Sequence, residues 1–247
     1  MEKKNVLITG GARGIGAAVA KEVARKGYRV FINYVNSTQV ANELASDINL
    51  NGGEAHTIQT DVRDDAQIKQ MFDKIEVDYG GVDILVSNAN MNFVPKSFIE
   101  QTWAEFSQKL NDEMHAAYVC AQHAATSMIE KKFGRIVFIS STLSEDPLPS
   151  FIAHGSAKGA LDSFNKYLAQ ELGPHGITTN IVAPGLVLTD ATSQAPDEFK
   201  EFIKSTTPTG TIAQPKDIAN AVAFFIKDSS SHITGTYLPV CGGAYLS

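Results

Sequence analysis

The chain alternates short runs of apolar and β-branched residues with longer stretches whose apolar residues recur at helical spacing. This alternation predicts parallel strands, because a helix between two strands returns the chain to the starting edge of the sheet. We expect an α/β fold with a doubly wound, seven-stranded parallel sheet. The expected strands are Asn5–Thr9, Arg29–Asn33, Glu54–Thr60, Val82–Ser87, Arg135–Ser140, Thr178–Val182 and Thr236–Val240.

Length and composition favour one domain over residues 1–247. The chain has 247 residues, of which 43% are hydrophobic, and this is enough to bury one full core in an α/β fold. No internal repeat, low-complexity tract or linker divides the sequence. Turn and capping residues mark helix ends: Asn36 and Asp64 each precede a glutamine by three positions, and Gly80 follows a helical stretch.

Charge and cysteine content exclude several classes of partner. The formal net charge of -6 is spread along the chain, so we expect no nucleic-acid partner and no anionic membrane surface. No apolar stretch approaches the roughly 18 residues of a membrane span. Cys120 and Cys241 lie far apart, with neither CxxC spacing nor histidines at metal-ligand spacing. We therefore expect no metal and a location in the reducing cytoplasm.

A glycine-rich loop follows the first expected strand and opens a helix. Residues 9–16 read TGGARGIG. Glycines allow a sharp turn and a close approach of the backbone to a pyrophosphate, and the helix N-terminus supplies free N–H groups. We expect a dinucleotide to bind here; the alternative is a glycine-rich turn with no ligand. The candidate residues are Gly10, Arg13, Gly14, Ile15 and Gly16.

The glycine spacing, TGxxxGxG, resembles that of the short-chain dehydrogenase/reductase family, and further matches in the family's order cover nearly the whole chain. Residues 87–90 read SNAN where the family has NNAG, and residues 184–189 read PGLVLT, which matches PGxxxT. Asn90 replaces a glycine, which implies a different backbone path or a positive φ that asparagine tolerates. The resemblance implies adenine contacts from Asp61 and Val62, and contacts to the nicotinamide end from Asn88, Ala89, Asn90, Pro184, Gly185 and Thr189.

The end of the second expected strand bears on the choice of coenzyme. In dinucleotide-binding folds, an acidic residue about 20 residues after the glycines binds the ribose 2′-hydroxyl of NAD. Tyr34 occupies that position and no carboxylate is near it, whereas Arg13 can pair with the 2′-phosphate of NADP. We expect NADP(H) rather than NAD(H). The alternative for Arg13 is an exposed side chain without a ligand.

The expected active site departs from the family's pattern. The family has an Asn-Ser-Tyr-Lys tetrad, in which serine orients the substrate carbonyl and tyrosine transfers the proton. Lysine lowers the pKa of the tyrosine, and asparagine holds a relay water. The resemblance assigns Ser141 and Lys158 to the serine and the lysine. His154 stands at the tyrosine position and Glu113 at the asparagine position.

The charge of His154 depends on its neighbours. His154 and Lys158 are four residues apart on one expected helix and share a face. The ammonium and the positive end of the helix dipole lower the pKa of the imidazole and leave it neutral at pH 7. If the Glu113 carboxylate reaches the same pocket, it neutralises Lys158 and returns the pKa of His154 toward 6.5. The sequence leaves both states open.

Three functions fit these residues. The first is an NADPH-dependent reductase of a carbonyl or related unsaturated group, in which Ser141 polarises the substrate and His154, or a water held by Glu113, delivers the proton. The second is a dehydratase, isomerase or cyclase that uses His154 and Glu113 as acid and base. The third is a catalytically silent subunit paired with an intact paralogue. The family's long helices form subunit interfaces, which implies a homodimer or homotetramer.

Residues 190–212 follow the nicotinamide loop and resemble the family's mobile substrate lid. Phe199, Phe202 and Ile203 recur there at helical spacing. Together with Phe93 they indicate a small apolar substrate. The alternative is an ordinary packed helix.

Overall fold

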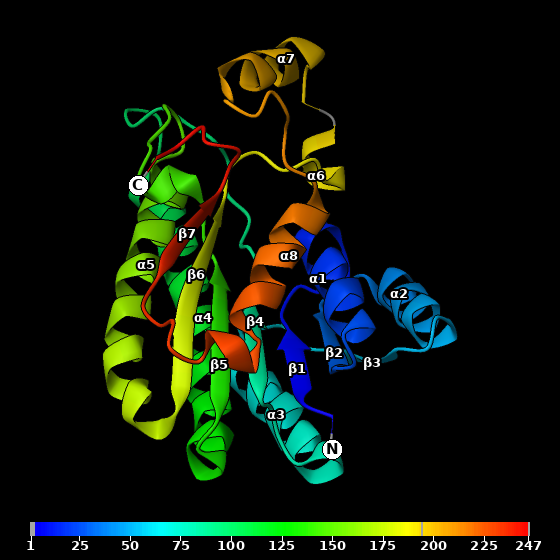
Figure 1. Cartoon of the computed structure of the whole chain (residues 1–247). Coiled ribbons are helices and arrows are strands. Elements are labelled where there is room, and N and C mark those ends of the chain that lie inside the picture. Colours follow the sequence, from blue (N-terminus) through cyan, green and yellow to red (C-terminus); the bar gives the residue numbers. More distant parts are fainter. Residues whose placement is uncertain (1–2, 194, 247) are drawn as a thin grey trace.

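The computed structural model describes residues 3–193 and 195–246, and one parallel sheet runs through it (Figure 1). The strands are β1 (Asn5–Ile8), β2 (Arg29–Tyr34), β3 (Glu54–Gln59), β4 (Ile84–Ser87), β5 (Gly134–Ile139), β6 (Ile177–Pro184) and β7 (Tyr237–Val240). All neighbours pair in parallel, in the order β3-β2-β1-β4-β5-β6-β7. The prediction of a doubly wound, seven-stranded parallel sheet is confirmed.

Helices cover both faces of the sheet. They are α1 (Gly14–Arg25), α2 (Thr38–Leu50), α3 (Asp65–Tyr79), α4 (Trp103–Lys131), α5 (Ile152–Leu172), α6 (Asp190–Ser193), α7 (Asp197–Thr206) and α8 (Pro215–Phe225). One hydrophobic core packs α1, α2 and α8 on one face, and a second packs α3, α4 and α5 on the other. This division follows from the reversal of strand order after β3, because each crossover keeps the same hand.

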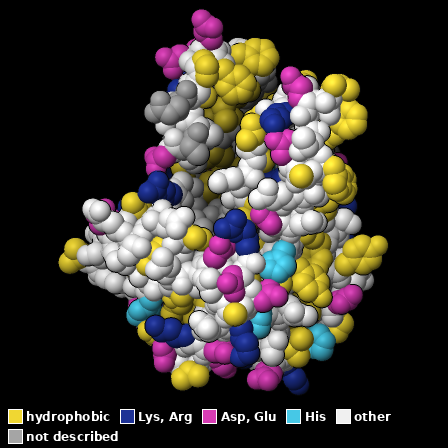
Figure 2. Space-filling model, turned by 180° about the vertical axis from the view of Figure 1, so that it is seen from behind, with side chains coloured by type: hydrophobic (Ala, Val, Ile, Leu, Met, Phe, Trp, Pro, Cys, Tyr) yellow, Lys and Arg dark blue, Asp and Glu magenta, His cyan; other side chains and the backbone are white. Residues whose placement is uncertain are grey.

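Loops and the helices α6 and α7 lie at the carboxyl ends of the strands. α6 and α7 stand beyond that end of the sheet (Figure 1). Figure 2 shows hydrophobic side chains gathered there, beside a hollow in the surface. Within the described residues, no helix combines the length and the apolarity that a membrane crossing needs.

Local capping chemistry sets some of the helix ends. The Asp64 side chain accepts a hydrogen bond of 3.0 Å from a backbone N–H in the first turn of α3, and Gly80 ends that helix with a φ of 75°. Both predictions are confirmed. Asn36 is not a cap, because α2 begins at Thr38 and its N-cap residue is Ser37. The prediction for Asn36 is wrong by one residue.

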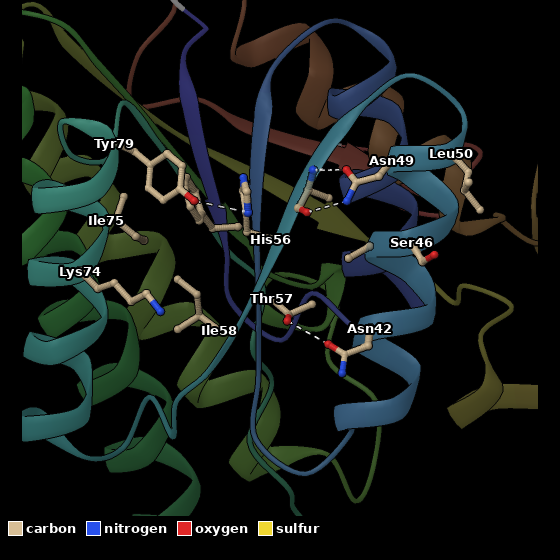
Figure 3. A pocket seen from close by; sticks show the side chains of 13 residues that line it. Asn42, Ser46, Asn49, Leu50, His56, Thr57, Ile58, Lys74, Ile75 and Tyr79 are labelled. Atoms are coloured by element: carbon tan, nitrogen blue, oxygen red, sulfur yellow. Dashed lines mark hydrogen bonds between the residues drawn. The ribbon is translucent and has the colours of Figure 1, made fainter.

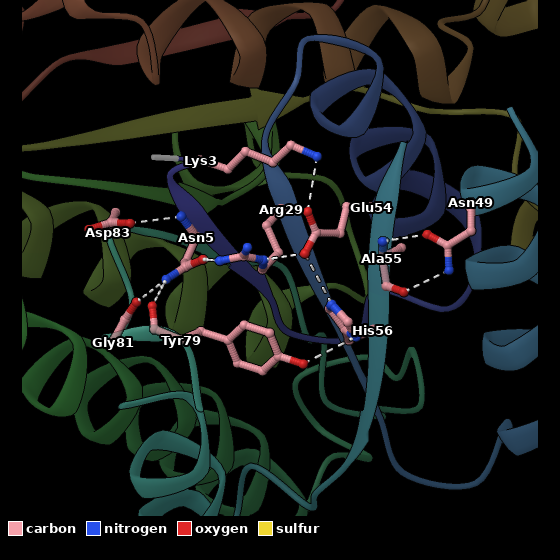
Figure 4. Close-up of polar contacts among 10 residues, drawn as sticks. All are labelled: Lys3, Asn5, Arg29, Asn49, Glu54, Ala55, His56, Tyr79, Gly81 and Asp83. Atoms are coloured by element: carbon pink, nitrogen blue, oxygen red, sulfur yellow. Dashed lines mark hydrogen bonds and ion pairs between the residues drawn. The ribbon is translucent and has the colours of Figure 1, made fainter. Parts of the chain in front are cut away.

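Among the strands that the structure describes, β3 is at the edge of the sheet, and a side chain covers part of its outer backbone. Asn49 of α2 accepts a hydrogen bond from the Ala55 N–H at 2.7 Å and donates one to the Ala55 carbonyl oxygen at 3.0 Å (Figures 3 and 4). The Asn49 amide therefore takes the place of a neighbouring strand. Such cover reduces pairing of the edge with another chain.

A cavity of about 670 Å³ opens beside β3, between α2 and α3 (Figure 3). The His56 ring in its wall packs against Phe31 and Tyr79, with ring centroids 5.5 and 5.0 Å away. Next to His56, Glu54 forms an ion pair with Arg29 (Figure 4). This network lies toward the amino ends of the strands, whereas ligands in this fold class bind outside the carboxyl ends. We therefore expect the functional site at the carboxyl ends of the strands.

We expect Asn49→Ala to lower the free energy of unfolding by about 1–3 kcal/mol, because the N–H and C=O groups of Ala55 lose their partners. Asn42→Ala is the control, since Asn42 lies in the same helix and binds the Thr57 side-chain hydroxyl rather than the backbone. Urea unfolding and light scattering measure stability and association. If the two variants prove equally stable and equally monodisperse, the edge of β3 does not need the Asn49 amide.

Candidate active site

The glycine-rich loop after β1 is held by the two neighbouring strands. The Gly10 N–H donates to Asn33 Oδ1, in β2, at 3.1 Å. The Asn88 amide, just after β4, donates to the carbonyl oxygens of Thr9 and Gly10 at 3.0 Å each. Gly10 has a φ of +61°, which glycine adopts at low cost. Hydrogen bonds to the neighbouring segments thus set the shape of the loop.

Close packing within the loop leaves room only for glycine at position 16. A Cβ atom at Gly16 would lie 2.6 Å from the Gly10 carbonyl oxygen and 2.7 Å from Asn88 Nδ2, so no larger residue fits. α1 begins at Gly14, and the N–H groups of its first turn have no partner within the helix. A cavity of about 550 Å³ lies beside Gly14 and Thr189. Bare N–H groups at a helix N-terminus beside a cavity fit a diphosphate.

The other residues that are expected to contact the coenzyme follow strands, at the same carboxyl ends of the sheet. Asp61 follows β3, and hydrogen bonds from Arg63 at 2.6 and 2.9 Å lower the pKa of its carboxyl. Val62 beside it is buried, whereas Ile15 in the first turn of α1 is half-buried. Ala89 follows β4, and its N–H donates to the Thr9 hydroxyl at 3.0 Å. Pro184 ends β6, and Gly185 and Thr189 follow it.

Tyr34 and Arg13 lie where the sequence predicts coenzyme selectivity. The Tyr34 ring is 8% exposed and packs in the core formed with α1 and α2. It therefore contributes an apolar contact to the fold and no negative charge to the loop. Arg13 is the exposed N-cap residue of α1, and its side chain makes no hydrogen bond or ion pair with the residues that the structure describes. Its guanidinium is available to an anion.

α4 and α5 bring together three charged side chains: Lys109 and Glu113 are four residues apart on α4, and Lys158 comes from α5. Lys158 Nζ donates to Glu113 Oε1 at 2.5 Å and to the Ile139 carbonyl oxygen at 2.8 Å. Glu113 Oε2 accepts from Lys109 Nζ at 2.6 Å and from the Met91 N–H at 3.1 Å. Lys109, Glu113 and Lys158 are 1%, 4% and 3% exposed. Burial raises the pKa of Glu113, but the two ammonium groups lower it further, to about 2.

His154 lies in the first turn of α5 and stacks on Phe93, with ring centroids 4.8 Å apart and planes 17° apart. The residue is 9% exposed, and its Nδ1 atom is buried without a hydrogen-bond partner in the described part of the chain. Burial, followed by the charges of Lys158 and Lys109, lowers the pKa of His154 to about 3. The imidazole is therefore neutral at physiological pH.

The neutral state of His154 has a different cause from the one that the sequence indicates. Glu113 does pair with Lys158, yet the pKa of His154 does not return toward 6.5. Desolvation is the largest effect, and burial cannot be deduced from the helical spacing. A second lysine, Lys109, also leaves the cluster with a net positive charge.

Ser141 and Asn90 complete the site. Ser141 follows β5, and its Oγ accepts a hydrogen bond from the Leu143 N–H at 3.2 Å, so its hydroxyl hydrogen can still donate. Asn90 has no positive φ, so of the two alternatives for this position the left-handed backbone is wrong and a different backbone path remains. Its side-chain oxygen accepts a hydrogen bond from Lys109 Nζ at 2.7 Å. Asparagine thus serves here through its amide and not through its backbone.

Sequence reasoning missed Lys109. The signal available to it is the spacing of Lys109 and Glu113, four residues apart on one helix face. That spacing is weak evidence by itself, because such pairs are frequent on exposed helix faces. Burial of both side chains distinguishes this pair, and burial depends on the packing of α4 against α5.

The doubly wound sheet with a glycine cradle after its first strand is the architecture of a dinucleotide-binding protein. A family model described as enoyl-(acyl carrier protein) reductase matches residues 10–245. Relatives described as 3-oxoacyl-(acyl-carrier-protein) reductase FabG occur in Haemophilus influenzae and Staphylococcus aureus. The first is 36% identical over 250 residues, covering 100% of both chains. The second is 32% identical over 246 residues, covering 98% of both chains.

A solved structure of a short-chain dehydrogenase/reductase from Serratia marcescens, in a doubly mutated form, superposes with a TM-score of 0.91. It is 30% identical in sequence, and the match covers 99% of each chain. The chain belongs to the short-chain dehydrogenase/reductase family. Its similarity to reductases over the full length makes it an oxidoreductase of that family.

His154→Asn is expected to reduce the loss of stability at acid pH. The unfolded chain takes up a proton on His154 below about pH 6.5, whereas the folded chain does so only near pH 3. Stability therefore falls as the pH falls between these values, by on the order of 5 kcal/mol over the full window. Urea unfolding from about pH 7 to 4 measures the effect, with the exposed His232→Asn as control. A stability difference between H154N and wild type that does not change with pH would argue against a buried neutral imidazole.

Proposed function

We propose that the chain is an NADP(H)-dependent reductase of a carbonyl, or a related unsaturated group, in a small apolar substrate. The observation that carries the proposal is the glycine cradle of residues 10–16. It is a helix N-terminus with no room for a side chain at Gly16 and with a cavity beside Gly14. The reductase names of the relatives support the class of reaction.

The residues of the cradle and of the following loops would hold the coenzyme. The first-turn N–H groups of Gly14, Ile15 and Gly16 fit its diphosphate, and Arg13 fits a 2′-phosphate by charge. When bound, the nicotinamide supplies a hydride. Further contacts are proposed from Gly10, Tyr34, Asp61, Val62, Asn88, Ala89, Asn90, Lys158, Pro184, Gly185 and Thr189. Because the Tyr34 ring is buried, we propose that Tyr34 contacts the coenzyme through its backbone.

The substrate oxygen would be activated by three side chains. The Ser141 hydroxyl donates to it, and Lys158 keeps one N–H beyond the two that bind Glu113 and Ile139. In this proposal His154 replaces tyrosine as the proton donor: its N–H proton passes to the substrate oxygen as the hydride adds, and water then returns a proton to the ring. A neutral imidazole donates a hydrogen bond to a carbonyl without carrying charge, as in triosephosphate isomerase.

The charge around the site supports reduction at a polarised oxygen. Lys109, Glu113 and Lys158 together carry a net positive charge in a buried cluster. Fixed positive charge stabilises the negative charge that develops on the oxygen as the hydride adds. The Glu113 carboxylate already accepts hydrogen bonds from both lysines, which counts against a relay water held by Glu113.

The non-redox alternative has less chemical support. Glu113 is ion-paired on both oxygens with a pKa near 2, so it is a poor base. His154, with a pKa of about 3, is a weak base too. An enzyme that depends on acid–base chemistry alone needs groups whose pKa values lie closer to neutrality. A catalytically silent subunit is distinguished by the activity test below.

Apolar side chains support a small apolar substrate. Phe93 contacts both His154 and Phe151, with ring centroids 4.8 and 5.9 Å away. On α7, Phe199 and Phe202 are 41% and 60% exposed, and α7 itself stands beyond the carboxyl ends of the strands (Figure 1). We propose that residues 190–212 close over the substrate, because exposed aromatic rings gain from covering an apolar ligand.

Exposed aromatic residues on α4 and α5 support a homodimer or homotetramer. Tyr118 and Tyr167 are 50% and 70% exposed on these helices, which pack side by side. Large exposed apolar groups on adjacent helices are typical of subunit interfaces. We keep the cytoplasm as the proposed location, which the free thiols of Cys120 and Cys241 support.

Arg13→Gln is expected to weaken NADPH binding by about 10- to 100-fold and to leave NADH binding nearly unchanged, because only NADPH carries the 2′-phosphate. Fluorescence titration with each coenzyme measures both affinities. Arg25→Gln, in the same helix and paired with Glu22, is the matched control. Equal losses for the two coenzymes would rule out a 2′-phosphate contact from Arg13.

The reaction itself is tested by mixing the purified protein with NADPH and a panel of 3-oxoacyl thioesters, enoyl thioesters and small ketones. We expect loss of nicotinamide absorbance with at least one of them, reduced at least 100-fold in Ser141→Ala. Ser46→Ala, beside the β3 cavity, is the control. Substrate turnover without an absorbance change would indicate the non-redox reaction. Inertness toward the whole panel would indicate the silent subunit.

A further inference from the structure

Lys109 is a lysine with almost no solvent exposure, 1%. Burial of an ammonium group is costly unless hydrogen bonds and an opposite charge replace its water. Lys109 Nζ donates to Asn90 Oδ1 at 2.7 Å, to the Met91 carbonyl oxygen at 2.8 Å and to Glu113 Oε2 at 2.6 Å. These three bonds use all of its N–H groups, so Lys109 itself has none left for a substrate.

Two of these partners are positions at which the chain differs from the family pattern. Asn90 stands in place of a glycine, and Glu113 stands in place of an asparagine. Both need the same buried cation: the Asn90 oxygen as an acceptor and the Glu113 carboxylate as a counter-charge. The two side chains are therefore coupled through Lys109.

The contacts of Lys109 extend in two directions. Through Glu113 they reach Lys158, whose ammonium binds the other carboxylate oxygen. Through Asn90 they reach the segment that begins at Asn88, whose amide binds the carbonyl oxygens of the glycine loop. Lys109 thus joins the active-site lysine to the loop at the start of α1.

We propose that Lys109 is a positioning residue, which holds Asn90 and Glu113 as one unit and through them fixes both Lys158 and the loop that carries Gly10. Its effect on coenzyme binding rests on the proposed function. Its effects on stability and on the charge of His154 do not rest on the proposed function.

The charges that face His154 come from two helices. Lys158 belongs to its own helix, α5, whereas Lys109 and Glu113 belong to α4. The segment before α4 contributes the apolar Phe93 ring, which stacks on the imidazole and lies 5.4 Å from Lys109 Nζ. Removal of the Lys109 charge should therefore raise the pKa of His154, and removal of the Glu113 charge should lower it further.

A thermal-unfolding cycle tests the coupling. Glu113→Gln leaves two buried ammonium groups without a counter-charge, and we expect its Tm to fall by on the order of 10 °C. Lys109→Met added to E113Q removes one of these charges, so the double variant should melt at a higher temperature than E113Q alone. Lys69→Met is the matched control, because Lys69 and Asp73 form an exposed ion pair with the same spacing. Additive effects of K109M and E113Q would overturn the proposal.

Two further measurements separate positioning from a purely structural role. NMR titration should show a higher pKa for His154 in K109M than in wild type and no change in K69M. NADP⁺ titration should show about 10-fold weaker binding to K109M. If K109M does not fold, Lys109→Gln, which keeps N–H donors, replaces it. An unchanged pKa in a folded Lys109 variant would overturn the proposal. If wild type binds no coenzyme, only the proposed function fails.

Discussion

The pairing of the buried Glu113 carboxylate with the ammonium groups of Lys109 and Lys158 is the interaction on which the candidate active site depends. An unpaired charge in this place would destabilise the fold strongly, so each lysine keeps the carboxylate ionised and the carboxylate keeps both lysines inside. Because Glu113 belongs to α4 and Lys158 to α5, the cluster also fixes the distance between these helices. The geometry and the net charge of the site follow from one buried anion and two cations.

The parallel sheet places this cluster and the glycine loop at the carboxyl ends of its strands. Each strand that ends there contributes a short segment, and hydrogen bonds between segments, such as those from Asn88 to Thr9 and Gly10, tie them together. Ser141, which follows β5, and Thr189, which follows β6, lie at the same ends of the strands. A coenzyme and a substrate can therefore meet there without movement of the sheet, with α6 and α7 beyond it (Figure 1).

Much of the fold could be predicted because its signals are local. Helical and strand periodicity predicted all seven strands, and the capping role of Asp64 needs only residues within one turn. The buried cluster could not be predicted in full, because Lys158 meets Glu113 only after α4 and α5 pack, and the burial of Lys109 depends on the same packing. The same limit applies to Asn90, whose partner is 19 residues away, and to the low pKa of His154, which depends mainly on burial.

A crystal structure of the complex with NADP⁺ tests the central claim most directly. We expect both ammonium groups of Lys109 and Lys158 within hydrogen-bonding distance of the Glu113 carboxylate, and the diphosphate on the N–H groups of Gly14–Gly16. We also expect the His154 ring beside the nicotinamide. A structure in which Lys158 has left Glu113, or in which the coenzyme lies away from the glycine loop, would contradict this account.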